Sequence, residues 1–210
     1  MKLLSVIPAR SGSKGIKNKN LINFLGKPLI SYSINFAKKI KNNTIIVSTD
    51  SKRIKDLTPQ DLGTNNYIRP KNLSRDDTLL EDTLYHAVKW ALKKKIYFDF
   101  ILVLQPTSPL RSHNDLLQSI KKYKKDKSYS LFSISRSLEH PSECIFFKGK
   151  NIHYFNKSRK TLRQNYNQSF FINGAIYIFN RNLLKNKKMI SKRNHSTFIM
   201  SKKNSIDIND

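Results

Sequence analysis

The chain has 210 residues, the length of one ordinary domain, and its 40 Lys and Arg against 14 Asp and Glu give a formal net charge of +26. None of its apolar runs approaches the roughly 20 residues that a membrane span needs, and the single cysteine, Cys144, excludes an internal disulfide and a cysteine-based zinc site. The apolar stretch at the N-terminus is too short for a secretion signal, so we expect a cytoplasmic protein.

Short apolar strands alternate with helical patterns along the chain, which is typical of an α/β fold with a mainly parallel sheet. We predict helices over 28–39, where Pro28 suits the first turn, over 79–95, and from Ser112 or Asn114 through Ile120. The strands are predicted at 3–7, 44–48, 100–104, 130–135 and 175–180.

The segment 138–170 has no clean period and is rich in lysine, asparagine and aromatic residues. We interpret it as an insert within a single domain over 1–210, because no linker or repeat marks a second domain.

The positive charge predicts an anionic partner, but the lysines are spread through the whole chain. They accompany many asparagines and isoleucines, a bias that an A- and T-rich coding sequence would produce. This pattern favours an unselective solvated surface and disfavours a nucleic-acid partner. A nonenzymatic nucleic-acid-binding protein stays open as an alternative, and it predicts a salt-steep, sequence-blind affinity for polyanions.

The loop over 9–20, after the first strand, combines glycines, serines and cations. In open α/β sheets ligands bind beyond the carboxyl ends of strands. Glycine lets backbone N–H groups approach phosphate oxygens, serine adds donors, and Arg and Lys neutralise charge. The glycine spacing matches neither a Walker A loop nor a dinucleotide fingerprint, yet the composition predicts phosphate binding.

Several short stretches follow one another in an order that one enzyme family shares. They are Ala9-Arg10-Ser11-Gly12-Ser13-Lys14 with Lys19-Asn20, then Ser48-Thr49-Asp50, Arg69-Pro70 with Asp76 to Thr78, Leu104 to Arg111, Asn173 to Tyr177, and Ser205 to Ile208. Through them nearly the whole chain resembles the acylneuraminate cytidylyltransferases, the CMP-sialic acid synthetase family. The resemblance implies a three-layer, Rossmann-like fold of the nucleotide-diphospho-sugar-transferase type.

The resemblance also implies a reaction, in which an acidic nine-carbon sugar attacks the α-phosphorus of CTP and pyrophosphate leaves. Such chemistry depends mostly on positioning and on charge neutralisation, with Mg²⁺ as cofactor. Arg10 and Lys19 are then the catalytic cations at the α-phosphate and leaving group, and Ser13, Lys14 and Asn20 hold the remaining oxygens.

Further residues complete the nucleotide and sugar sites that the resemblance implies. Arg69, held extended by the following proline, matches the cytosine-reading arginine, with Asp76 and Thr78 in the same pocket. The candidates for the sugar are Gln105, Thr107 and Ser108 at the end of an apolar strand, Asn173 at the start of another, and Arg163 and Gln164 in the insert. An arginine is a natural partner for a sugar carboxylate, although the flanking family proline is missing here. The insert is also expected to make a homodimer contact.

The end of the chain departs from the family pattern. The metal motif of the family has two aspartates two residues apart, and here they are Asp207 and Asn209. Residues two apart on a strand face one side, so we expect both as magnesium ligands, with Asp207 the principal one and Asp210 facing away. Relatives continue past Asp210, which suggests a C-terminally truncated member.

The identity of the sugar stays open at this point. The sequence of the first loop favours sialic or legionaminic acid, through the segment Gly15-Ile16-Lys17-Asn18-Lys19-Asn20. Pseudaminate, 3-deoxy-manno-octulosonate and a degenerate, non-catalytic paralogue remain as alternatives. The five scattered histidines show no ligand spacing, and none is assigned a catalytic role.

Overall fold

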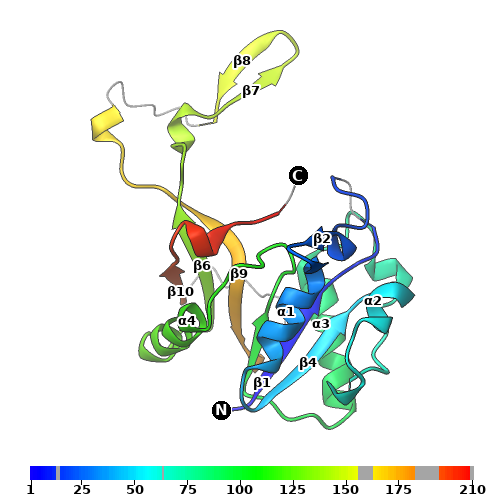
Figure 1. Cartoon of the computed structure of the whole chain (residues 1–210). Coiled ribbons are helices and arrows are strands. Elements are labelled where there is room, and N and C mark those ends of the chain that lie inside the picture. The colour runs from blue at the N-terminus through cyan, green and yellow to red at the C-terminus, as the bar shows by residue number, and fades with distance from the viewer. Residues whose placement is uncertain (13–14, 63, 156–162, 183–193, 209–210) are drawn as a thin grey trace.

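The computed structural model describes residues 1–12, 15–62, 64–155, 163–182 and 194–208. A six-stranded sheet in the order β10-β6-β9-β5-β1-β4 forms its centre (Figure 1). Within this sheet β9 alone runs antiparallel to its neighbours, so the expected mainly parallel sheet is confirmed. The strands are β1 (Leu3–Pro8), β4 (Asn43–Ser48), β5 (Phe100–Val103), β6 (Ser130–Arg136), β9 (Phe170–Asn180) and β10 (His195–Ile199).

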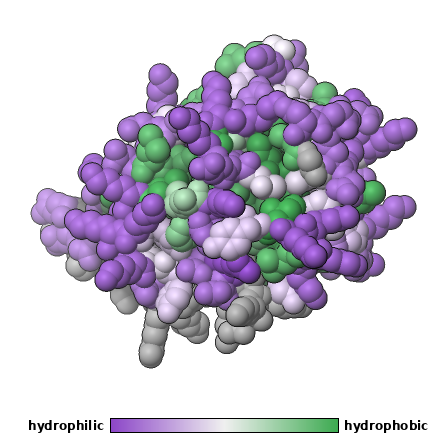
Figure 2. All heavy atoms as spheres, turned by 90° about the horizontal axis from the view of Figure 1, so that it is seen from below, coloured by the Kyte–Doolittle hydropathy of each residue, from purple (hydrophilic) through white to green (hydrophobic). Residues whose placement is uncertain are grey.

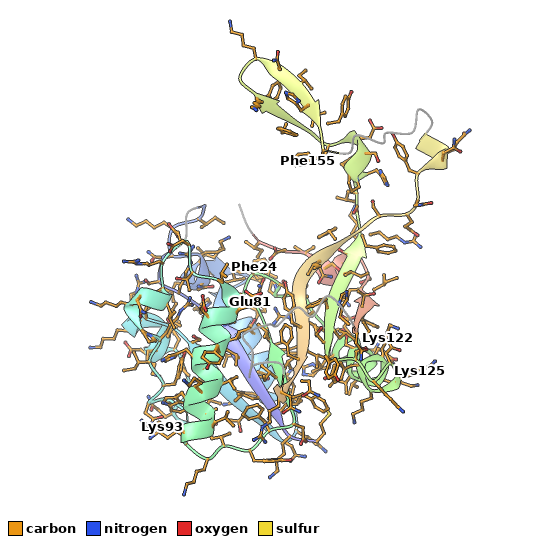
Figure 3. The ribbon with its side chains drawn as sticks, turned by 180° about the vertical axis from the view of Figure 1, so that it is seen from behind. Phe24, Glu81, Lys93, Lys122, Lys125 and Phe155 are labelled. Carbon is orange, nitrogen blue, oxygen red and sulfur yellow. The ribbon has the colours of Figure 1, made fainter. Side chains whose placement is uncertain are left out.

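Helices cover both faces of the sheet, which gives the three layers (Figures 1 and 3). On one face α1 (Leu29–Lys38), α2 (Lys52–Asp56) and α4 (His113–Lys125) pack on strand residues such as Ile7 and Leu102. On the other face α3 (Leu80–Lys93) packs on Leu4 and Val6. The two core clusters share β1 because successive side chains of a strand point to opposite faces.

The helix termini follow simple capping and charge rules. Ser112 and Asp115 form a capping box at the start of α4, in which the Ser112 hydroxyl accepts from the Asp115 N–H at 3.1 Å and the Asp115 carboxylate accepts from the Ser112 N–H at 3.0 Å. Helix α3 has Glu81 in its first turn and Lys93 in its last, which complements the helix dipole (Figure 3). The predicted start of α4 after Ser112 is confirmed.

Other predicted boundaries shift. Pro28 precedes α1 as its N-cap and pairs in β3 (Lys27–Pro28) with β2 (Asn23–Phe24), so it is not in the first turn. Leu92, near the end of α3, is exposed. Strand β9 begins at Phe170 rather than at 175, and β10 and α2 were not predicted. The short 3-10 helices are η1 (Lys19–Leu21), η2 (Gln60–Leu62), η3 (Lys71–Leu73), η4 (Pro141–Glu143), η5 (Arg163–Asn165) and η7 (Lys203–Ser205).

The insert extends away from the sheet as a hairpin of β7 (Ile145–Lys148) and β8 (Asn151–Tyr154) (Figure 1). Every residue of both strands is exposed, and Phe155 lies at the foot of the hairpin, also exposed (Figure 3). Seen from below, away from the hairpin, the molecule carries hydrophilic side chains spread over the whole face, with smaller hydrophobic patches between them (Figure 2). Among the described helices, none has the length and apolar character needed to cross a membrane.

Candidate active site

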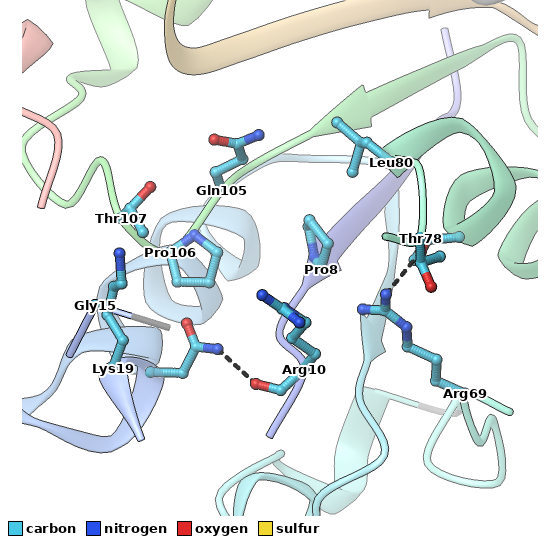
Figure 4. Close-up of a pocket in the computed structure, with 12 residues that line it drawn as sticks. Pro8, Arg10, Gly15, Lys19, Arg69, Thr78, Leu80, Gln105, Pro106 and Thr107 are labelled. Atoms are coloured by element: carbon cyan, nitrogen blue, oxygen red, sulfur yellow. Dashed lines mark hydrogen bonds between the residues drawn. The ribbon is translucent and has the colours of Figure 1, made fainter. Parts of the chain in front are cut away.

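A cavity of about 400 Å³ opens at the carboxyl ends of the parallel strands β1, β4 and β5. Parallel strands end at one edge of the sheet, so their loops meet there although they are far apart in sequence. Arg10 and Lys19 from the loop after β1, Arg69 from the connection after β4 and Gln105 from the loop after β5 surround the cavity (Figure 4). The full lining is Pro8, Arg10, Gly15, Lys19, Asn20, Arg69, Thr78, Leu80, Thr83, Gln105, Pro106 and Thr107.

The loop after β1 is held at two points. The buried Asn20 side chain donates to the carbonyl oxygen of Arg10 at 3.0 Å. At the other point, Asp50 at the end of β4 accepts from the backbone N–H and the hydroxyl of Ser11, at 2.8 and 2.7 Å. Burial raises the pKa of Asp50, but the hydrogen bonds from Ser11 and the charge of Arg69 outweigh it, so the pKa lies below its usual value. Asp50 thus anchors the loop, a role that the sequence analysis did not assign.

Arg10 forms an ion pair with Asp76 beside the cavity, and both side chains are partly exposed. The sequence analysis assigned Arg10 to phosphate and Asp76 to the base pocket, and the structure brings the two together. A phosphate oxygen that entered the cavity would compete with Asp76 for the Arg10 guanidinium.

Arg69 is fixed from behind. It is 5% exposed, and its Nε donates to the carbonyl oxygen of Leu73 at 2.7 Å. Its Nη2 donates to the same oxygen and to Thr83 Oγ1, the latter at 2.8 Å. Burial lowers the pKa of Arg69, while Tyr67 and Asp50 act in the opposite direction. Within the described chain these bonds use Nε and Nη2, which leaves Nη1 available at the cavity.

A buried hydrogen-bond chain lies behind Arg69. The Tyr67 hydroxyl is 3.3 Å from Ser48 Oγ and 2.9 Å from His86 Nδ1. Burial raises the pKa of Tyr67, and burial together with Arg69 and Lys89 lowers the pKa of His86. These effects favour the neutral imidazole, whose Nδ1 lies within hydrogen-bond distance of the Tyr67 hydroxyl. The sequence does not predict this series of hydrogen bonds, because nothing along it links position 67 to position 86.

The 105–108 loop, which follows β5, divides the predicted sugar residues. Gln105 and Thr107 line the cavity. Ser108 is buried and donates to the carbonyl oxygen of Asn173 at 3.4 Å. The Asn173 side chain, 1% exposed, accepts from Ser133 Oγ at 2.6 Å and donates to Ser205 Oγ at 3.0 Å. Ser108 and Asn173 thus support the cavity wall from behind.

Two predicted residues belong to η5 of the insert, and three others lie outside the described residues. Gln164 is exposed in η5 of the insert, and Arg163 begins that short helix. Ser13, Lys14 and Asn209 lie outside the described residues. Among the described side chains, Gln164 is not part of the cavity lining.

Asp207 lies in a short segment, 206–208, that docks on the 105–108 loop, where the Ile208 N–H donates to the Thr107 carbonyl oxygen at 2.8 Å. The carboxylate is close enough to Tyr177 to raise its pKa, after the larger effect of burial. Burial lowers the pKa of Arg111 to about 9, and Asp207 opposes that shift. Asp207 is thus beside the cavity wall and near a buried cation.

The acidic side chains near the cavity decide whether a magnesium ion could bind there. Among the described residues no group of three or more His, Cys, Asp or Glu could hold a metal by itself. Mg²⁺ often takes only one or two protein carboxylates and completes its shell with phosphate oxygens and water. One aspartate at the wall of a cationic cavity fits that second arrangement.

The chain is similar to known proteins in both sequence and fold. A model of the family described as cytidylyltransferase matches residues 4–206. The chain is 31% identical over 215 residues to an N-acylneuraminate cytidylyltransferase of Escherichia coli O18:K1:H7, covering 100% of this chain and 49% of that protein. It is 31% identical to a pseudaminic acid cytidylyltransferase of Campylobacter jejuni (serotype O:23/36) and 32% identical to a CMP-N,N'-diacetyllegionaminic acid synthase of Legionella pneumophila, each time over 99% of this chain and 91% of the relative.

The fold has the same kind of neighbours. A solved structure of CMP:2-keto-3-deoxy-manno-octonic acid synthetase complexed with CTP superimposes with a TM-score of 0.66 at 21% identity, over 95% of this chain and 90% of that one. The expected nucleotide-diphospho-sugar-transferase type of α/β fold is confirmed. The chain spans about half the length of the Escherichia coli relative and most of the length of the other two.

Proposed function

The chain belongs to the cytidylyltransferase family, and on that premise we propose that it transfers CMP from CTP to an acidic nine-carbon sugar of the sialic or legionaminic type. In this reaction the anomeric oxygen of the sugar bonds to the α-phosphorus, and the bond from that phosphorus to the α,β-bridging oxygen breaks. Pyrophosphate leaves, and the anomeric hydroxyl loses its proton. The observation that supports the proposal most is the meeting of Arg10, Lys19 and Arg69 in one cavity.

The cations of the cavity serve the triphosphate in this proposal. Arg10 and Lys19 neutralise the charge that grows on the α-phosphate and on the leaving pyrophosphate, where preorganised donors are most effective. Asn20 fixes the main chain of Arg10 through its hydrogen bond. Ser13 and Lys14, outside the described residues, hold further phosphate oxygens.

Arg69 reads the base. Arg69 lines the cavity together with Thr78 and Thr83, and its Nη1, which the bonds to Leu73 and Thr83 do not use, can donate to a cytosine carbonyl oxygen. The bonds to Leu73 and Thr83 fix the guanidinium before the nucleotide arrives, so little rotamer entropy is lost on binding. Asp76 lies next to this pocket through its pair with Arg10.

The sugar is placed against the 105–108 loop. The amide of Gln105 and the hydroxyl of Thr107 suit sugar hydroxyls, and Arg163 with Gln164 is the proposed partner of the sugar carboxylate. Ser108 and Asn173 act from behind by holding the loop and β9 together. The relatives act on several sugar acids. Our preference for sialic or legionaminic acid rests on the sequence of the first loop.

Asp207 and Asn209 are the proposed holders of Mg²⁺, which when bound neutralises phosphate charge. Asp207 brings a full charge to this pair and Asn209 only a carbonyl oxygen. The protein's part is to keep the Asp207 segment against Thr107, as the Ile208 hydrogen bond does.

We also propose a homodimer, and action in the cytoplasm, where CTP is available. The support for the dimer is the exposed apolar surface of the hairpin, which a second copy would cover. Its exposed residues include Ile145, Phe146, Phe147, Ile152, Tyr154 and Phe155. Analytical ultracentrifugation of the wild type and of Phe147→Asp tests this: the wild type should sediment as a dimer and the variant as a monomer.

The reaction is tested by pyrophosphate release with CTP, Mg²⁺ and a panel of acids: N-acetylneuraminate, legionaminate, pseudaminate and 3-deoxy-manno-octulosonate. We expect release and a CMP-sugar product with one of the first two. Reactions without sugar control for simple CTP hydrolysis. Pyrophosphate release that does not depend on a sugar acid contradicts the proposal, and so does the absence of any pyrophosphate release.

A further inference from the structure

Arg111, just past the 105–108 loop, is a buried cation to which the proposed reaction assigns no role. Its residue is 5% exposed, and a guanidinium removed from water is costly unless its donors are used. Nη1 donates to Ser33 Oγ in α1 at 2.9 Å, and Nη2 donates to the main-chain oxygen of Gln105. The guanidinium carbon lies 5.7 Å from the centre of the Phe36 ring. Two prongs of one planar group thus join α1 to the loop.

The carbonyl oxygen of Gln105 is the centre of this arrangement. Besides Arg111, it accepts from Ser33 Oγ at 3.3 Å and from the Ser108 N–H at 3.3 Å. A carbonyl oxygen offers two lone pairs, so three donors restrain the plane of this peptide strongly. The direction in which the Gln105 side chain enters the cavity depends on that peptide.

The same loop holds the segment that carries Asp207. The Thr107 carbonyl oxygen accepts the Ile208 N–H at 2.8 Å, and the negative charge of Asp207 acts on Arg111. Arg111 is therefore linked to the 206–208 segment twice: by charge to Asp207, and through the 105–108 loop to Ile208.

We propose that Arg111 is a positioning residue that fixes the 105–108 loop and the 206–208 segment relative to each other, and so sets Gln105 and Asp207 in register without touching substrate. The consequence for catalysis rests on the proposed function. The geometric consequence does not: the two segments lose order together when the guanidinium fork is lost.

Three variants separate the fork from the charge. Arg111→Lys keeps a positive charge near Asp207 but cannot reach Ser33 Oγ and the Gln105 oxygen with one planar group. Arg111→Met removes both. Ser33→Ala removes one arm and leaves Arg111 on Gln105. Lys121→Met, an exposed position on α4, is the control for loss of an unrelated cation.

The first measurement is amide hydrogen exchange of the whole protein without substrate. We expect exchange at the Ser108 and Ile208 amides to rise at least about tenfold in Arg111→Lys, with a smaller rise in Ser33→Ala and none in Lys121→Met. Unchanged exchange at both amides in Arg111→Lys overturns the proposal. If Arg111→Met does not fold, the lysine and Ser33 variants still decide it.

The second measurement is steady-state kinetics with the sugar that the wild type uses. For Arg111→Lys we expect the KM for sugar to rise about 10- to 100-fold. The magnesium concentration for half-maximal activity should rise as well, because the change also displaces Asp207, whereas Lys121→Met should leave both constants unchanged. A fall in melting temperature with unchanged constants per folded molecule overturns the proposal in favour of a merely structural role. If the wild type transfers no CMP, the proposed function fails, and the exchange result still judges Arg111.

Discussion

The Oε1 atom of Gln105 lies 2.7 Å from the point at which a Cβ on Gly174 would stand. Gly174 also has a φ of +74°, in the left-handed region that favours glycine. The glycine of the Asn173-Gly174-Ala175 motif therefore makes room for the side chain of Gln105, which reaches it from the neighbouring strand's loop. A glycine within strand β9 thus sets the position of a candidate sugar-binding residue on another segment.

Gly174→Ala should displace Gln105. The added methyl group meets the movable end of a side chain, so the backbone keeps its course, and the cost in unfolding free energy is the strain of a positive φ, about 1–2 kcal/mol. The sugar KM should rise several-fold because the Gln105 amide has moved. Gly149→Ala is the matched control, since Gly149 has a φ of +64° and nothing within 4 Å. It should lose similar stability and leave the KM unchanged. Equal KM values in the two variants contradict the argument.

Arg10→Ala should remove most activity and leave folding intact. Arg10 is partly exposed, packs little core and pairs only at the surface with Asp76, and such pairs contribute little stability. Losing a cation that faces developing phosphate charge costs roughly 100- to 1,000-fold in kcat. Lys17→Ala, an exposed cation of the same loop, should keep its activity. A melting temperature that collapses together with activity in Arg10→Ala would instead make Arg10 structural.

The sequence predicts the sheet better than the supports of the site. Strand β5 is an uninterrupted apolar run and Ser5 is the one hydroxyl residue in β1, so composition and length identify both strands. Strand β10, in contrast, has polar residues at three of its five positions, His195, Ser196 and Thr197, and only its pairing with β6 makes it a strand. Local propensity contains no information about such a partner.

The site shows the same division. Residues that a short motif carries, such as Arg10, Arg69 and Gln105, line the cavity. Asp50 and Arg111 stand in the same motifs, yet their roles depend on the partners Ser11 and Ser33, which lie far away in sequence. Asn173 begins the buried stretch of β9. From sequence alone, this position fits a ligand-binding residue and a core support equally well. Only the three-dimensional contacts separate these two roles.

The wild type should prefer CTP strongly over UTP and ATP, and Thr83 should contribute to the affinity for CTP. A purine is too large for a pocket bounded by Arg69, and UTP presents an acceptor where cytosine presents its amino donor. Thr83→Val leaves a buried Arg69 donor unpaired and frees the guanidinium, which should raise the KM for CTP roughly tenfold. Thr83→Ser keeps the acceptor and should stay near wild type. Equal turnover of CTP and UTP by the wild type contradicts the preference for CTP, and an unchanged KM for CTP in Thr83→Val contradicts the role of Arg69.

His86 should make stability fall as the pH falls. Its pKa in the folded protein lies below the ordinary 6.5 because of burial, Arg69 and Lys89, so the unfolded chain binds the proton first. The stability from the neutral imidazole is therefore complete above that ordinary value and is lost as the pH drops toward the folded pKa. His86→Asn offers Tyr67 an acceptor without a titrating ring. Thermal melts between about pH 7.5 and about pH 5.5 should show a smaller decrease in Tm for this variant, and equal slopes contradict the assignment.

Asp207→Asn should abolish CTP-dependent pyrophosphate release. With Asn209 beside it, Asp207 supplies the only full charge of the proposed ligand pair, and a hard cation binds a neutral amide far more weakly than a carboxylate. Its segment is held by the Ile208 bond to Thr107, so the substitution should change the ligand and not the fold. A magnesium titration at fixed CTP and sugar measures the effect, with the melting temperature as the control for folding.

The same titration distinguishes the ligand pair from its neighbour. Asn209→Asp adds the second charge of the family motif and should lower the magnesium concentration that gives half-maximal activity. We propose that the segment stays extended beyond Ile208, where side chains two apart share a face and adjacent ones do not, so Asp210→Ala should change little. If Asp207→Asn keeps full activity, or Asp210→Ala alone destroys it, the facing argument is wrong and the metal is held by other residues. The magnesium requirement should fall in Asn209→Asp, and Asp207→Asn should stay inactive. These two results together support Asp207 and residue 209 as ligands of one ion, because each change then acts on the same metal dependence.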